Sequence, residues 1–170
     1  MLDDKLRDDE KRIKMKKEHN IMEIAIRQLD LAIRLFIKEN EGAAAILLAS
    51  ASEETFAKEL NKKGKVTLLT FAKACMEIEN EITSKEVNDK HANRVKNWLK
   101  HADAPSLIYD EEEQAFQYIL RAISNYFLLF GNFNKTHYEF EAYVKKNIPR
   151  LGTKMDLQMI EKAASSKAAS

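Results

Sequence analysis

The chain has 170 residues, 45% of them hydrophobic and 32% charged, which predicts one globular domain with its own core. With 28 basic and 27 acidic residues the formal charge is +1, so binding to nucleic acid or an anionic membrane would require a local patch. The single cysteine excludes an intrachain disulfide, and no apolar run approaches the roughly 18 residues that a membrane span needs. We therefore expect a cytoplasmic protein that does not enter the membrane.

The first half of the chain predicts long helices, because glycine and proline are scarce and no alternating strand pattern persists. Residues 1–19 are very polar and predict an arm or a frayed helix. Residues 20–39 carry a strongly amphipathic helical pattern that is apolar over most of its circumference. A second helix is expected over 43–63, between Gly42 and Gly64.

The second half predicts further helices, which are separated by recognisable start and stop signals. These helices are expected over residues 67–81, 84–102, 111–130 and 137–147. Capping-box spacings beginning at Thr83 and at Thr136 mark two of the starts, and the carboxylates of residues 110–113 suit the positive end of a third. Pro149 and Gly152 set off a short final helix.

The loops between these segments are short, so helices adjacent in sequence should pack antiparallel in a bundle of about four to five main helices. We predict an all-α protein in three parts: the polar arm over 1–19, the helical bundle over 20–150, and a short C-terminal helix with a tail over 151–170.

The histidines lack the spacing of a metal site. A carboxylate-bridged di-iron bundle needs Glu-x-x-His motifs, but the residues three positions before the four histidines are Lys16, Asn88, Trp98 and Asn134. One cysteine and scattered histidines do not supply zinc ligands, and the chain has no glycine-rich phosphate loop. We expect neither a metal nor another cofactor. The aromatic residues from Tyr126 to Phe133 have the spacing of core packing, with base stacking as the alternative.

The predicted helix 84–102 carries the most distinctive pattern. Arg94 and His101 are seven residues apart, which is about two helical turns, and Asn97 lies within one turn of each. Lys90 falls on the same stripe, about 150° from the centre of the apolar face. A cation, an amide and an imidazole in one line would bind a phosphate and transfer a proton. The alternative is a solvated helix face without chemistry.

One stripe supplies only half of a site for RNA cleavage. In-line attack by a ribose 2′-hydroxyl needs one group that removes a proton and another that supplies a proton to the leaving oxygen. A single copy of this helix offers one imidazole in the stripe. Two copies that face each other across a twofold axis would offer two, so the cleavage hypothesis predicts a homodimer.

The segment from Arg94 to His101 resembles the signature of the HEPN superfamily (higher eukaryotes and prokaryotes nucleotide-binding), an Arg followed by a His after about four to six residues. It fits in two ways. Arg94 pairs with His101 across six residues, or Lys96 stands in the place of the Arg, directly before Asn97. The resemblance extends over residues 20–131, including an alanine-rich helix with two adjacent glutamates.

The resemblance implies a compact, often dimeric helical bundle that acts as a metal-independent endoribonuclease in bacterial defence or toxin–antitoxin systems. His101 would then be the general acid and base, Arg94 or Lys96 would stabilise the phosphate charge, and Asn97 would orient the phosphate or the imidazole. Lys90 would add to the binding of the ligand.

Two further questions stay open in the sequence. Glu54 would help to orient the site residues, or else be a surface carboxylate paired with Lys58. The protein as a whole would be an enzyme, or else a non-catalytic module that binds RNA, a nucleotide or a protein partner such as an antitoxin or a nucleotidyltransferase.

Overall fold

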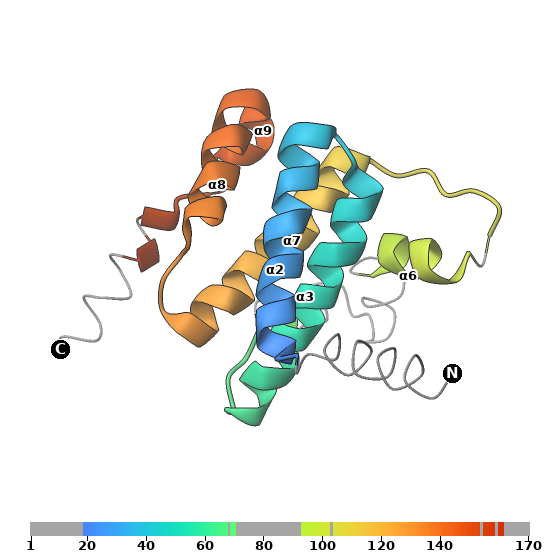
Figure 1. Ribbon diagram of the computed structural model, residues 1–170. Helices are drawn as coiled ribbons and strands as arrows, with labels where there is room; N and C mark the ends of the chain where they lie inside the picture. The colour runs from blue at the N-terminus through green and yellow to red at the C-terminus, as the bar shows by residue number, and fades with distance from the viewer. Residues whose placement is uncertain are drawn as a thin grey trace, which may run out of the picture.

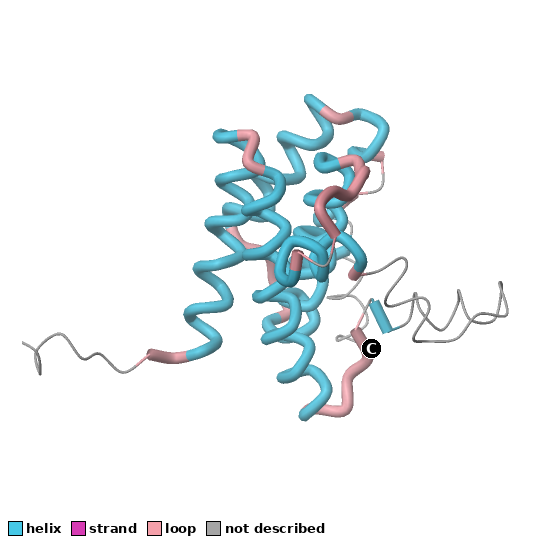
Figure 2. Tube along the Cα trace, turned by 90° about the vertical axis from the view of Figure 1, so that its right-hand side faces the viewer, coloured by secondary structure: helices cyan, strands magenta, loops and turns pink. Residues whose placement is uncertain are grey.

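The computed structural model describes residues 19–67, 69–70, 93–102, 104–153, 155–158 and 160–161. Its named elements are α2 (Ile21–Arg34), the π-helical turn η1 (Leu35–Glu39), α3 (Gly42–Lys62), α6 (Arg94–His101), α7 (Glu111–Phe130), α8 (Lys135–Asn147) and α9 (Pro149–Gly152) (Figure 1). Figure 2 shows only helices and loops in this part of the chain, which confirms the predicted all-α class.

Several predictions fall outside the described residues. They are the arm over 1–19 apart from His19, most of the helix over 67–81, the capping box at Thr83, and Lys90. Among the described helices, none has both the length and the apolar character that crossing a bilayer requires.

Helices α2, α3, α7 and α8 form the body of the fold (Figure 1). The pairs α2–α3 and α7–α8 are antiparallel, as the short connections predict. By contrast, α3 and α7 run in the same direction. At their starts the Ala43 amide donates to Glu111 Oε1 at 3.0 Å, and near their ends Lys65 Nζ donates to the Leu128 carbonyl at 2.8 Å.

The core lies between these helices and follows from their apolar spacing. In α2 and η1 the buried residues recur every three or four positions; they are Ala25, Leu29, Ala32, Ile33 and Phe36. Small residues on α3 let it approach α2 closely, and Ser52 Oγ donates to the Ala25 carbonyl at 2.8 Å. Phe140 of α8 closes the core, stacking on Phe116 at 5.9 Å between ring centroids and packing against Phe36 at 5.6 Å.

The helix ends explain both a correct and an incorrect prediction. Asp110 caps α7 by accepting the Glu113 amide at 2.9 Å, and Gly131 ends that helix in the left-handed conformation at φ 76°. The predicted cap at Thr136 is wrong. Helix α8 begins two residues earlier because Asn134 Oδ1 accepts the His137 amide at 3.0 Å while His137 Nδ1 accepts the Asn134 amide at 3.3 Å.

The C-terminal residues pack against the bundle. Leu151, Met155 and Leu157 belong to the same buried cluster as the main helices. Gly152 lies so close to α8 that a Cβ atom there would be 2.6 Å from Lys145 Cα.

Candidate functional site

Helix α6 presents the predicted stripe outward. Val95 and Lys96 are its buried residues, whereas Arg94 and His101 are exposed and Asn97 is half-buried. This burial follows from the helical wheel, because Val95 projects from a different side of α6 than the stripe. The structure therefore brings Arg94, Asn97 and His101 to one outer face. Lys90, which was predicted to extend this stripe, lies outside the described residues.

Lys96 and Glu54 meet on the inner side of α6. Lys96 Nζ donates to Glu54 Oε1 at 2.8 Å, and Lys100 Nζ approaches the same oxygen at 3.5 Å. Burial by itself would raise the pKa of Glu54, but the hydrogen bond from Lys96 and the charges of both lysines outweigh it and lower the pKa. The predicted alternative pairing of Glu54 with Lys58 is wrong, because Glu54 is directed toward α6.

A second ion pair lies deeper, between α3 and α7. Arg121 Nε donates to Glu53 Oε1 at 2.8 Å, and Arg121 Nη2 donates to Glu53 Oε2, so the contact is bidentate. Arg121 Nη2 also donates to Asn93 Oδ1 at 3.4 Å, and its guanidinium lies 4.4 Å from the centre of the Tyr118 ring. The pair connects α3, α7 and the residue that precedes α6.

This network borders a small polar pocket of about 160 Å³. Its lining is mixed in charge and hydrogen-bonding character and includes Glu53, Glu54, Asn93, Lys96 and Arg121. Sequence reasoning missed this network. The sequence shows a glutamate pair within the alanine-rich α3 and an arginine in the middle of the apolar α7. Neither feature indicates which residue will be its ion-pair partner.

The outer edge of α6 contacts the loop that leads into α7. The Trp98 ring meets Tyr109 edge-on with centroids 6.2 Å apart, and Trp98 Nε1 donates to the Ala104 carbonyl at 2.8 Å. A cavity of about 320 Å³ opens beside these residues, and Arg94 lines it together with Asp110 and other residues of the loop and α7. Arg94 therefore shares this cavity with Asp110, whose carboxylate accepts the Glu113 amide and pairs with Arg150.

The carboxylates at the start of α7 have structural partners. Arg150 is held by Asp110 at 3.1 Å, Glu112 at 3.2 Å and Glu113 at 3.4 Å. Glu111 caps the first turn of α3. Among the described residues, no group of three His, Cys, Asp or Glu side chains is placed to bind a metal.

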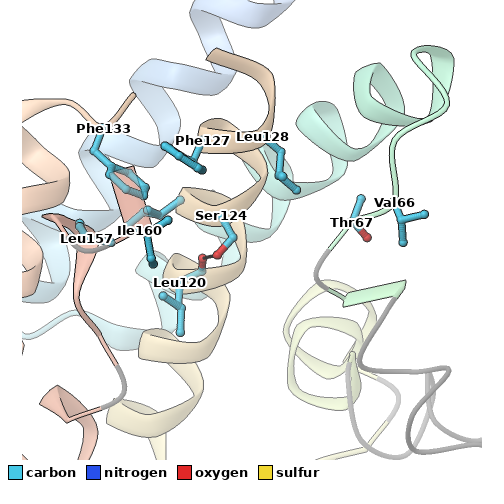
Figure 3. Close-up of a pocket in the computed structure, with 10 residues that line it drawn as sticks. Val66, Thr67, Leu120, Ser124, Phe127, Leu128, Phe133, Leu157 and Ile160 are labelled. Atoms are coloured by element: carbon cyan, nitrogen blue, oxygen red, sulfur yellow. Dashed lines mark hydrogen bonds between the residues drawn. The ribbon is translucent and has the colours of Figure 1, made fainter. Parts of the chain in front are cut away.

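The largest of the pockets described here is apolar, and none of the stripe residues lines it. It measures about 420 Å³ and lies along the second half of α7, where Figure 3 shows Phe127, Leu128 and Phe133 around it, with Val66 and Ile160 on opposite sides. The remaining aromatic residues of the run, Tyr126 and Phe130, pack against Phe56, with ring centroids 6.0 and 6.5 Å from it.

His137 is fully buried, so it is not a candidate for acid–base catalysis on a solvent-borne substrate. Burial lowers its pKa to about 4. In comparisons with known proteins, no family model, no curated protein and no solved structure matches this chain.

Proposed function

We propose that this chain is a HEPN-like helical protein that binds RNA through the outer face of α6, and that two copies together cleave it without a metal ion. One observation carries the proposal: α6 buries Val95 and Lys96 and leaves Arg94, Asn97 and His101 on a single accessible face. Of the two cations that fit the motif, Lys96 is engaged by Glu54, so Arg94 is the one that faces solvent. The planar guanidinium suits a phosphate better than an ammonium does.

In this proposal the base and the acid are two imidazoles. One His101 removes the proton of the ribose 2′-hydroxyl as its oxygen forms a bond to phosphorus. The bond from phosphorus to the 5′-oxygen breaks, and the second His101 gives that oxygen a proton. Arg94 and Asn97 stabilise the phosphoryl oxygens. The products are a 2′,3′-cyclic phosphate and a 5′-hydroxyl.

Single-stranded RNA incubated with the full chain in a metal chelator tests this proposal. Wild-type protein should release 2′,3′-cyclic phosphate ends, with a rate per chain that falls on dilution as dimers separate. His101→Ala should abolish cleavage and leave the thermal midpoint unchanged, because His101 is exposed. His19→Ala, which also removes an exposed histidine, is the matched control and should cleave normally. Intact RNA with wild-type protein, in chelator and in Mg²⁺ alike, would refute the enzyme.

A non-catalytic module is the second candidate, and the charge around Arg94 favours it. Lys96 is held in an internal ion pair with Glu54, so the outer face is less cationic than the sequence of α6 indicates. The partner would be a cytoplasmic RNA, nucleotide or protein of the antitoxin or nucleotidyltransferase kind. Binding of fluorescent RNA or nucleotide without cleavage, weakened by Arg94→Ala, would identify this function.

A further inference from the structure

Apolar and polar contacts together attach α6 to the bundle, because Val95 belongs to the buried core and Leu99 packs against it. Only two of its eight residues are buried, and one of them is a lysine. Asn93, the residue before α6, accepts a hydrogen bond from Arg121. Trp98 packs on the loop that follows α6. Val95 and Leu99 turn one side of α6 toward the core. An ion pair between α6 and α3 adds a contact that is specific in direction.

Glu54 provides that interaction. Its Oε1 atom receives Lys96 at 2.8 Å and Lys100 at 3.5 Å, two residues one turn apart on the same side of α6. The Lys96 side chain is 10% exposed, so this ammonium is largely removed from water and depends on its carboxylate partner.

The rotation that this contact fixes is the one that exposes the stripe. Around an ideal helix, Arg94 and His101 lie about 160° and 140° from Lys96. When Lys96 points at α3, the other two therefore point away from it. A helix that rolled by one residue, about 100°, would carry the stripe toward the bundle or along its surface.

We propose that Glu54 is the positioning residue of α6, holding Lys96 and Lys100 so that Arg94, Asn97 and His101 face outward. The consequence for RNA rests on the proposed function, whereas the docking of α6 does not. Glu54 touches no substrate in this proposal and acts only through the two lysines.

Trp98 makes the docking measurable without any activity. It is the only tryptophan of the chain, it lies on α6, and its indole packs against Tyr109. The variant is Glu54→Gln, which keeps the size of the side chain and removes its charge. The matched control is Glu59→Gln, also on α3, whose carboxylate pairs with Lys62 and Lys63 near its own helix end instead of α6.

Glu54→Gln should increase acrylamide quenching of Trp98 and speed amide exchange in α6 by roughly tenfold, as the loss of a charge-assisted hydrogen bond implies. High salt should also increase the quenching and the amide exchange of the wild-type protein, and should change those of Glu54→Gln much less. Glu59→Gln should leave both readouts at the wild-type level. Unchanged quenching and exchange in Glu54→Gln would overturn the inference.

A charge exchange separates positioning from a general loss of stability. Lys96→Glu alone should loosen α6, and Lys96→Glu combined with Glu54→Lys should restore much of the Trp98 protection. Failure of the double variant to regain any protection would count against a specific contact. If α6 loosens as described while wild-type protein neither binds nor cleaves RNA, the proposed function fails and the positioning role stands.

Discussion

Acidification should destabilise the fold through one buried histidine, His137. Its ring is fully buried, Nδ1 accepts the Asn134 amide, and Nε2 has no hydrogen-bond partner among the described residues. The neutral ring fits this site, with its proton on Nε2. A protonated ring would place a charge in the core and remove the acceptor that closes the cap of α8.

The magnitude follows from the pKa. Burial lowers the pKa of His137 from 6.5 to about 4, which corresponds to about 3.4 kcal/mol at about 1.36 kcal/mol per pKa unit. On acidification His137 takes up its proton at a higher pH in the unfolded chain than in the folded one. The free energy of unfolding therefore starts to fall as the pH drops below 6.5, and His137 causes no further loss below about pH 4. At about pH 5 the loss should be about 2 kcal/mol.

Urea unfolding followed by circular dichroism, from about pH 7.5 to pH 4, measures this effect against His137→Gln. Glutamine accepts the cap amide through Oε1 but does not titrate, so subtracting the two curves removes the contribution of the carboxylates. The unfolding free energy of wild type minus that of His137→Gln should fall by about 2 kcal/mol from about pH 7 to pH 5, because only the wild-type chain contains the titrating ring. A difference that stays constant over this interval would refute the reasoning.

Three further substitutions should change stability in ways that urea or thermal unfolding resolves. Arg121→Leu alone should lower the unfolding free energy by about 3 to 5 kcal/mol, because it leaves Glu53 buried without its charge partner. The double variant Arg121→Leu with Glu53→Leu should lose much less, and an equal loss in the two proteins would contradict this explanation. Gly152→Ala should cost about 1 to 3 kcal/mol because its Cβ would press on the backbone of Lys145, and a neutral effect would mean that α9 shifts freely. Asp110→Ala should cost about 1 kcal/mol through the lost cap, with Asp110→Asn as the control that retains most of it.

The helices were largely predictable because their signals are local. The pattern over 111–130 predicts α7 with both of its ends, since Asp110 and Gly131 are the residue types that start and stop helices. At α8 the local signal misled. Two overlapping caps were available, and the ring of His137 settles the choice by reaching back to Asn134, a role that is more often taken by Glu or Gln.

The site was predictable in part. Helical periodicity alone places Arg94 and His101 on the outside of α6, and the structure agrees. The partner of Glu54 is 42 residues away in sequence, and that of Glu53 is 68 residues away. No local pattern encodes such distances, because they depend on how α3, α6 and α7 pack. The parallel direction of α3 and α7, which are not adjacent in sequence, depends on the same packing.

That parallel direction has a consequence for how the molecule tolerates change. Two helices pointing the same way cannot be joined by a tight turn, and α6 lies in the longer stretch of chain between Lys62 and Glu111 that joins them. The candidate chemistry is thus carried by a connector rather than by the four helices that enclose the core. Substitutions on its outer surface would change the proposed activity and leave the core between the four helices unaltered.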